Sequence, residues 1–150
     1  MLKKNFIILL FIFISGCGYT PIYSNLNNDQ FNIILIKTTG NSEINNLIQN
    51  KLKKYEGNTN KKSFNIILKT EYKKIIVAKN SDGVASDYEL VINANFAIND
   101  GEISKNIVIQ EKFKIKKNDN VFEERSYENS IKRSFADLIV QKLITQLLSY

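Results

Sequence analysis

Hydrophobic and polar residues alternate with different periods along this chain of 150 residues, and each period predicts an element. The segment 31–38 is apolar on both faces and rich in β-branched residues, which is typical of a central strand. From Ile44 to Tyr55 apolar residues recur at intervals of three and four, behind a start signal at 40–42. This spacing predicts an amphipathic helix that ends before Gly57.

A segment of alternating residues at 63–79 follows, and it predicts a strand far longer than usual. Its alternation lapses at Lys73 and Lys74, and the next three residues, 75–77, are apolar on both faces. We therefore expect a bulge or a projecting extension at this point of the strand.

Two further strands are predicted, each introduced by an Asp-Gly turn signal, at 82–83 and at 100–101. The strand 87–99 alternates cleanly, and the strand after Gly101 is apolar on one face and polar on the other. Together with 63–79 these strands form an antiparallel meander. The residues expected to face inward are Tyr88, Leu90, Ile92, Ala94, Phe96, Ile98, Ile107, Ile109, Phe113 and Ile115.

A long helix is predicted at the C-terminus, with Ser126 as its N-cap and with Glu123 and Glu124 just before its positive end. Glu128 and Lys132 have the spacing of a favourable i,i+4 ion pair on this helix. The apolar stripe of the helix consists of Ile131, Phe135, Leu138, Ile139, Leu143 and Leu147.

The order of elements, β-α-β-β-β-α, defines the fold class. One-sided strands need cover on their apolar face, and two amphipathic helices supply that cover. The sequence therefore predicts an α+β two-layer sandwich, in which a four-stranded mixed sheet is covered on one face by two helices. A right-handed crossover through the first helix makes the first two strands parallel.

The N-terminus carries a targeting signal. Two lysines precede an unbroken apolar run at 6–14, which is too short to span a membrane as a helix and is typical of a signal peptide. The next residues, Ile-Ser-Gly-Cys at 14–17, resemble the bacterial lipoprotein box, whose cysteine receives lipid before cleavage. We expect a lipoprotein signal peptide at 1–16, a lipidated tether at 17–30 that begins with Cys17, and a domain at 31–150. The alternative is an unmodified Cys17 in a secreted protein, and the ordered signal features disfavour it.

Composition narrows the possible functions. The chain has no histidine and one cysteine, so the common triads, the commonest zinc ligand and an internal disulfide are missing. We therefore expect neither an enzyme nor a metal or other cofactor, and a lipoprotein hydrolase is disfavoured. The 21 basic and 15 acidic side chains give a net charge of +6. Because the lysines are scattered and the signal exports the chain, nucleic acid is disfavoured as a partner.

The residues after the lipoprotein box carry a family resemblance. The segment 17–23, Cys-Gly-Tyr-Thr-Pro-Ile-Tyr, matches an opening of cysteine, glycine, aromatic, any residue, proline, aliphatic and tyrosine. Ser126 and Tyr127 lead a terminal helix that contains Phe-Ala-Asp at 135–137, and the element order agrees as well. With these features the chain resembles the LptE family of lipopolysaccharide-assembly lipoproteins, in particular its α-proteobacterial branch.

The resemblance implies a non-enzymatic protein of the cell outer membrane, anchored by lipid on the periplasmic side. Its partners are then an LptD-type β-barrel, in which it is a plug, and lipopolysaccharide, which it binds and helps deliver to the surface. A lipid anchor, a basic domain and a small sandwich are compatible with this role. The alternative is a generic periplasm-facing lipoprotein that acts as an envelope scaffold or binds a small ligand in a closed pocket.

The resemblance also implies lipopolysaccharide-binding residues. In the family, a basic residue at the end of the second strand takes part in binding, and its best match here is Lys79. A second basic position lies before the last helix, where Arg125 is the nearest candidate. Lys73 and Lys74, beside the predicted projection, are further candidates, because phosphates favour cations held on a projecting element.

Two other groups of residues have a functional and a simpler interpretation. A row of lysines on the last strand could bind anions, but lysines on an edge strand also discourage aggregation, and we favour that explanation. Aromatic and aliphatic residues next to the lipid could pack on a barrel wall or lie in the membrane interface. The first group is Lys112, Lys114, Lys116 and Lys117, and the second is Tyr19, Ile22 and Tyr23.

Overall fold

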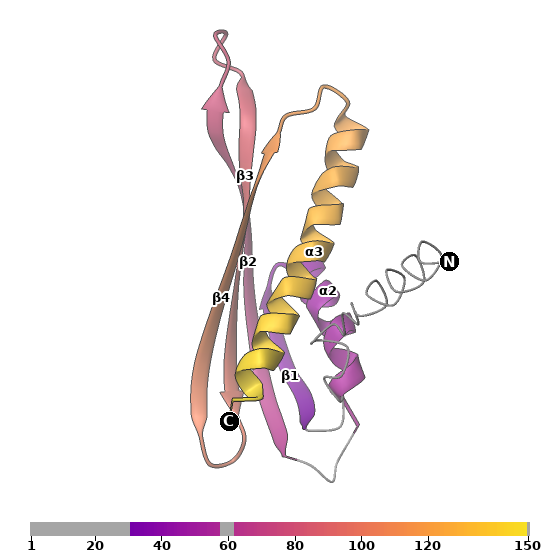
Figure 1. Cartoon of the computed structure of the whole chain (residues 1–150), viewed down its shortest axis with the longest axis vertical. Coiled ribbons are helices and arrows are strands. Elements are labelled where there is room, and N and C mark those ends of the chain that lie inside the picture. The colour runs from indigo at the N-terminus through magenta and orange to yellow at the C-terminus, as the bar shows by residue number, and fades with distance from the viewer. Residues whose placement is uncertain (1–30, 58–61, 150) are drawn as a thin grey trace, which may run out of the picture.

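One sheet of four strands and two α-helices make up the fold of the described residues (Figure 1). The computed structural model describes residues 31–57 and 62–149. The strands lie side by side in chain order, with β1 parallel to β2 and with β2, β3 and β4 antiparallel to one another. The elements are β1 (Asn32–Gly40), α2 (Ser42–Leu52), a short 3-10 helix (Lys53–Tyr55), β2 (Ser63–Lys79), β3 (Ala85–Asn99), β4 (Ser104–Lys116) and α3 (Val121–Leu147).

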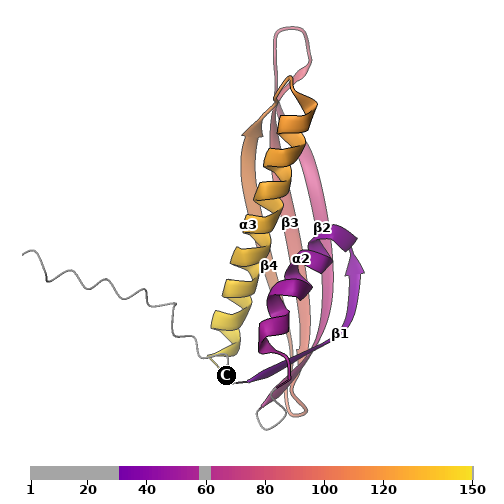
Figure 2. The same cartoon turned by 90° about the vertical axis from the view of Figure 1, so that its right-hand side faces the viewer.

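Both helices lie on the same face of the sheet, as Figure 2 shows, and this confirms the predicted two-layer α+β sandwich. The core lies between the helices and the inward side chains of the strands. At one end of the core Phe31 stacks on Tyr55, with ring centroids 5.8 Å apart, and its edge meets Phe64. The side chains with no exposed surface include Ile33, Ile48, Leu68, Ile92, Phe96, Ile139 and Leu143.

The position of β1 differs from the prediction. It is an edge strand and not a central one, because β2 is its only neighbour in the sheet. Its inward residue Ile33 is buried, whereas Ile34 and Ile36 are largely exposed, and the register shifts between Leu35 and Lys37. An apolar pattern on both faces is typical of a central strand, but here the outward half of the pattern remains in contact with solvent.

The end of β1 is fixed by a close approach to β2. Gly40 has a φ of +94°, and a Cβ atom at this position would lie 1.8 Å from the carbonyl oxygen of Thr70. The next residue, Asn41, donates its backbone N–H to that oxygen, and its side chain caps α2 by accepting from the Ile44 N–H at 3.0 Å. The Thr70 hydroxyl donates to the Asn45 side chain at 2.7 Å. The chain therefore leaves the sheet at Gly40, and β2 continues without β1.

Beyond this point β2 and β3 project as a long hairpin (Figure 1). The predicted extension is therefore present, and the bounds of β2 agree with the predicted 63–79. The irregularity lies later than expected, because Lys73 and Lys74 pair regularly with β3 and the register shifts between Ile76 and Lys79. The turn at the tip includes Gly83, whose φ is +78°.

Helix α3 begins earlier than predicted. Its N-cap is Asn120 and not Ser126, because the Asn120 side chain accepts from the N–H groups of Phe122 and Glu123 at 3.0 and 3.3 Å. Glu123 and Glu124 therefore lie within its first turn. The predicted stripe on this helix is buried with one exception, Leu138, which is 41% exposed.

We predict that Gly40→Ala destabilises the protein by roughly 3 kcal/mol, because a Cβ atom would overlap the Thr70 carbonyl and because φ is positive. The measurement is chemical denaturation of the variant and the parent. Gly83→Ala is the matched control, since its φ is also positive but its surroundings are open, and we expect a cost of about 1 kcal/mol. Equal losses for the two variants would show that the contact with Thr70 has no energetic role.

Candidate functional site

The projecting end of the sheet exposes apolar side chains on both faces. Ile75, Ile76 and Val77 on β2 are between 43% and 50% exposed, and Val84 at the tip and Phe113 on β4 are exposed to a similar extent. Phe113 has the predicted inward orientation, since it pairs with Leu90, but it lies at the open end of the sheet. An exposed apolar cluster at one end of a small domain is typical of a contact surface.

The candidate lysines of β2 have different surroundings. Lys79 lies at the end of β2, exposed and in register with Ala85. Lys73 is exposed on the uncovered face of the sheet and forms an ion pair with Glu71, with Nζ and Oε1 2.8 Å apart. Because successive side chains of a strand point to opposite faces, the neighbouring Lys74 points to the helix side.

Lys74 is held by α3. Its Nζ lies 2.7 Å from an oxygen of Glu124 and 3.0 Å from an oxygen of Glu128, and it also lies 4.5 Å from the ring centroid of Tyr88. Burial opposes a charged lysine, but the hydrogen bonds to the two carboxylates raise the pKa of Lys74 above its ordinary value. This cation therefore joins the projecting hairpin to the helix.

Arg125 lies in the first part of α3 and not before it, and its side chain is exposed. The two open grooves at this end of the described residues, of about 570 and 340 Å³, are lined by none of Lys73, Lys74, Lys79 and Arg125. The structure therefore places the four candidate cations near one end of the molecule without assembling them into one pocket.

Lys132 was predicted only as the i,i+4 partner of Glu128, yet it is the centre of a charged cluster. It is 8% exposed, and its Nζ lies 2.8 Å from Glu43 on α2 and 3.4 Å from Glu128. It also lies 4.7 Å from the ring centroid of Tyr72 on β2. The predicted Glu128–Lys132 pair is thus confirmed, but the spacing gave no signal for Glu43 or Tyr72.

Tyr72 and Glu128 connect the two halves of this cluster. The Tyr72 hydroxyl donates to Glu128 at 2.6 Å. Burial and this hydrogen bond raise the pKa of Tyr72 well above its usual range. Burial works against the ionised form of Glu128, but hydrogen bonds from Tyr72 and Lys74 and the charge of Lys132 hold the pKa of that carboxyl below its ordinary value. With Glu43 and Glu124 these side chains form a cluster of six polar residues that fastens α3 to β2 and to α2.

An open cleft of about 570 Å³ lies between the end of β4 and the start of α3. Phe113, Ile115 and Tyr127 supply its apolar part, and Lys117 and Glu124 are among its charged residues. A second groove, of about 340 Å³, lies beside the tip of the hairpin and also includes Lys117. Both are wide and shallow, so this end of the molecule offers a surface and not an enclosed site.

The uncovered face of the sheet carries the predicted lysine row. Lys73 and Lys112 lie on either side of Val91 in the same register, and Val91 is buried beneath them. Lys114 and Lys116 continue the row on β4. The edge position of β4 agrees with the prediction, and these exposed lysines make that edge an unfavourable template for another strand.

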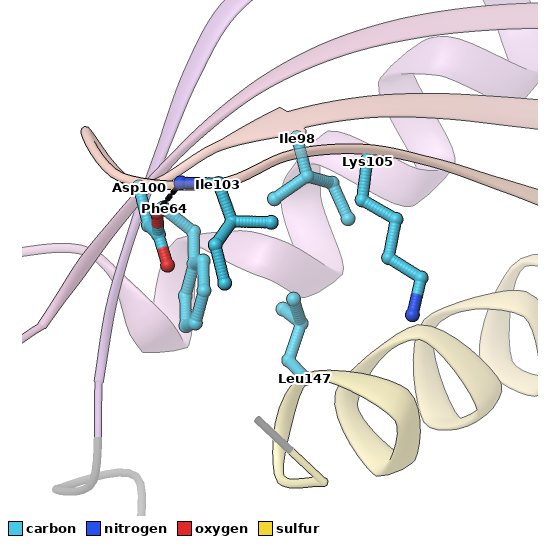
Figure 3. Close-up of a pocket in the computed structure, with 6 residues that line it drawn as sticks. All are labelled: Phe64, Ile98, Asp100, Ile103, Lys105 and Leu147. Carbon is cyan, nitrogen blue, oxygen red and sulfur yellow. Dashed lines mark hydrogen bonds between the residues drawn. The ribbon is translucent and has the colours of Figure 1, made fainter.

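At the opposite end of the molecule a small cavity of about 20 Å³ has room for one water molecule (Figure 3). Phe64, Ile98 and Leu147 contribute to its lining, together with Asp100. Backbone hydrogen bonds from Ile103 and Glu102 and an ion pair with Lys62 lower the pKa of Asp100 to about 2. Asp100 therefore stabilises its turn, and this cavity is too small for a ligand.

In 31–57 and 62–149 there is no group of three or more metal-ligating side chains that could hold an ion. No helix in this part of the chain combines the length and the apolar character that crossing a membrane requires.

The fold and its projecting end define a small α+β sandwich with a basic, partly apolar hairpin. The chain belongs to the LptE family: the family described as "LptE: Lipopolysaccharide-assembly" matches residues 29–147. Among curated proteins, no sequence matches the chain.

Solved structures of three bacterial lipoproteins are similar in fold. Rare lipoprotein B from Shewanella oneidensis has a TM-score of 0.56 at 14% identity, covering 80% of this chain and 97% of its own. Uncharacterized lipoprotein B from Nitrosomonas europaea has a TM-score of 0.52 at 13% identity, covering 78% of this chain and 82% of its own. A minor lipoprotein from Acinetobacter baumannii has a TM-score of 0.50 at 16% identity, covering 79% of this chain and 90% of its own.

We predict that the charged cluster makes stability depend on pH in the acid range. Folding lowers the pKa values of Glu124 and Glu128 from 4.5, so their contribution is complete above that value and is lost as pH falls through the lower folded values. The Glu128→Gln variant should be less stable than the parent at about pH 7, and it should lose less stability than the parent on acidification. Thermal unfolding across this range provides the measurement.

Glu56→Gln is the control for this experiment, because Glu56 is an exposed carboxylate outside the cluster. We expect the stability of this variant to change with pH in the same way as that of the parent. Parallel curves for Glu128→Gln and the parent would contradict a stabilising role for the ionised Glu128.

Proposed function

We propose that this protein is an outer-membrane lipoprotein that assists lipopolysaccharide assembly by binding lipopolysaccharide and supporting an LptD-type β-barrel. The observation that carries the proposal is membership of the lipopolysaccharide-assembly family over nearly the whole folded domain. The three similar lipoprotein structures support the fold part of the argument. In this role the protein works by adhesion and positioning and performs no chemical reaction.

The anchor in this proposal is Cys17. It lies outside the described residues, as do the signal peptide at 1–16 and the tether at 17–30, so these assignments rest on the lipoprotein box in the sequence. Acyl chains on Cys17 would hold the domain on the periplasmic side of the outer membrane. Tyr19, Ile22 and Tyr23 would then lie close to the membrane or to the barrel.

Lys79 is our first choice for lipopolysaccharide binding. It is exposed at the end of the projecting strand, where a lipid A phosphate can approach it from solvent. Lys73 is also accessible, since its ion pair with Glu71 is half-exposed and therefore costs little to exchange. Arg125 is exposed on α3 and can bind a phosphate through two donors.

Lys74 has a weaker case as a ligand for phosphate. Its ammonium group already contacts Glu124, Glu128 and the ring of Tyr88, so a phosphate would have to displace two carboxylates. We therefore assign Lys74 a positioning role, in which it holds α3 against the hairpin that carries Lys79.

The shape of the domain is compatible with a barrel partner. The long sheet and α3 form an elongated body, and its projecting end exposes apolar residues such as Ile75 and Ile76 that a partner could cover (Figure 1). A small-ligand binder, the alternative, needs an enclosed pocket. The wide grooves near β4 and α3 favour contact with a large partner instead.

We predict that Lys79→Glu weakens lipopolysaccharide binding by about tenfold at low salt and by less at physiological salt, because added ions screen exposed charges. The measurement is equilibrium binding of purified lipopolysaccharide to the full chain in detergent. Lys53→Glu is the matched control, since it reverses an equally exposed charge on the 3-10 helix. Equal binding by Lys79→Glu and the parent at low salt would remove Lys79 from the site.

We also predict that the full chain, solubilised in detergent from its own cells, co-purifies with a large outer-membrane β-barrel. Partner identification by mass spectrometry and a native mass measurement provide the test. If all of the lipoprotein is recovered without a partner, the result would contradict the barrel partnership. It would not affect the family assignment.

A further inference from the structure

The upper part of β2 has a free edge. Pairing between β1 and β2 ends at Gly40 and Thr70, where the Asn41 N–H donates to the Thr70 carbonyl. From there to Lys79 the strand pairs only with β3, and no other strand of the described residues lies on its other side. Figure 2 shows β1 ending well below the tip of β2.

The direction of the unpaired backbone groups follows from strand geometry. The N–H and C=O groups of one residue point to the same side of a strand, and the side alternates from residue to residue. Because the carbonyl of Thr70 points towards β1, the groups of Tyr72, Lys74 and Ile76 point to the same, now open, side. Lys73 and Ile75, in contrast, point their backbone groups towards β3.

The side chains at this edge are unusual for an unpartnered strand. Ile75, Ile76 and Val77 expose 43–50% of their surface and lie on both faces of the sheet. An apolar pattern on both faces is typical of a strand with neighbours on both sides. The free edge of β4 alternates apolar residues with lysines over 112–116, as protected edges do.

We propose that the edge of β2 from Glu71 to Val77 receives an extended segment of another protein as an added strand. The fitting segment is apolar where it borders Ile75 and Ile76 and carries a carboxylate beside Lys73. Lys73 can form an ion pair with this carboxylate, because its present ion pair with Glu71 is half-exposed and costs little to break. Backbone hydrogen bonds supply affinity in such a contact, and the flanking side chains supply selectivity.

A second copy of this chain fits the same edge poorly. In an antiparallel pair of two copies, a two-fold axis at Lys73 or Lys74 places like charges directly opposite each other, which is unfavourable. With the axis at Ile75, the paired segment would include the register shift that follows Ile76. With the axis nearer Thr70, the second copy would overlap β1. The charge pattern therefore favours a different protein with an acidic and apolar strand.

The test uses residue-resolved amide hydrogen exchange of the full chain in detergent, with a synthetic valine-rich peptide that carries one glutamate, to lie beside Lys73, as the probe. In the free protein, the amides of Tyr72, Lys74 and Ile76 should exchange quickly, whereas those of Lys73 and Ile75 are protected by β3. Addition of the peptide should slow the first three by about tenfold or more and leave the other two unchanged. This alternation would distinguish an added strand from general apolar adhesion.

Ile75→Lys should abolish the protection by the peptide, because it places a charge where the peptide is apolar. Val108→Lys is the matched control, since it adds the same charge at a 67% exposed valine on the same face of the sheet, on β4. A peptide with lysine in place of glutamate should bind more weakly than the acidic peptide.

Unchanged exchange of Tyr72, Lys74 and Ile76 in the presence of the acidic peptide would overturn the proposal. Protection of these amides in the free protein would overturn it as well, since a second copy or the chain itself would then cover the edge. The two proposals share Lys73, but Ile75→Lys tests the added strand and leaves every residue assigned to lipopolysaccharide in place. Each proposal can therefore fail separately.

Discussion

The contact between Gly40 and Thr70 determines how the rest of the molecule is arranged. It ends the parallel pairing of β1 with β2, and Asn41 begins α2 at the same point. Below this contact four strands and two helices enclose an apolar core. Above it three strands and the first part of α3 continue without β1, and the candidate cations and the exposed apolar residues Ile75, Ile76 and Val77 lie there.

The two parts of the molecule are held together by different forces. The lower part depends on apolar burial, supported at its surface by the ion pairs Lys51–Asp137 and Lys142–Glu111. In the upper part, no side chain of α3 from Val121 to Ser130 is buried. The contacts of Lys74 and Tyr72 on β2 with Glu124 and Glu128 hold this half of the helix to the sheet.

The sequence predicted those parts of the fold that depend on one-sided burial. The alternation in β3 and the stripe of α3 after Ile131 were informative because one face of each element lies in the core. The start of α3 could not be found in this way, because its first ten residues bury no apolar side chain and leave no periodic signal. The edge position of β1 was missed because its outward isoleucines imitate a buried strand. The charged cluster was missed because Tyr72 and Glu128 are 56 positions apart, and Glu43 and Lys132 are 89 apart.

The overhang of β2 beyond β1 also has a mechanical consequence. Its nine residues from Glu71 to Lys79 extend for about 30 Å at the usual rise of a strand. On the β1 side this length has no support, whereas on the other side β4 pairs with β3 as far as Asp87, and Lys74 and Tyr72 bind α3. A load on the tip is therefore carried by β4 and α3 and not by β1.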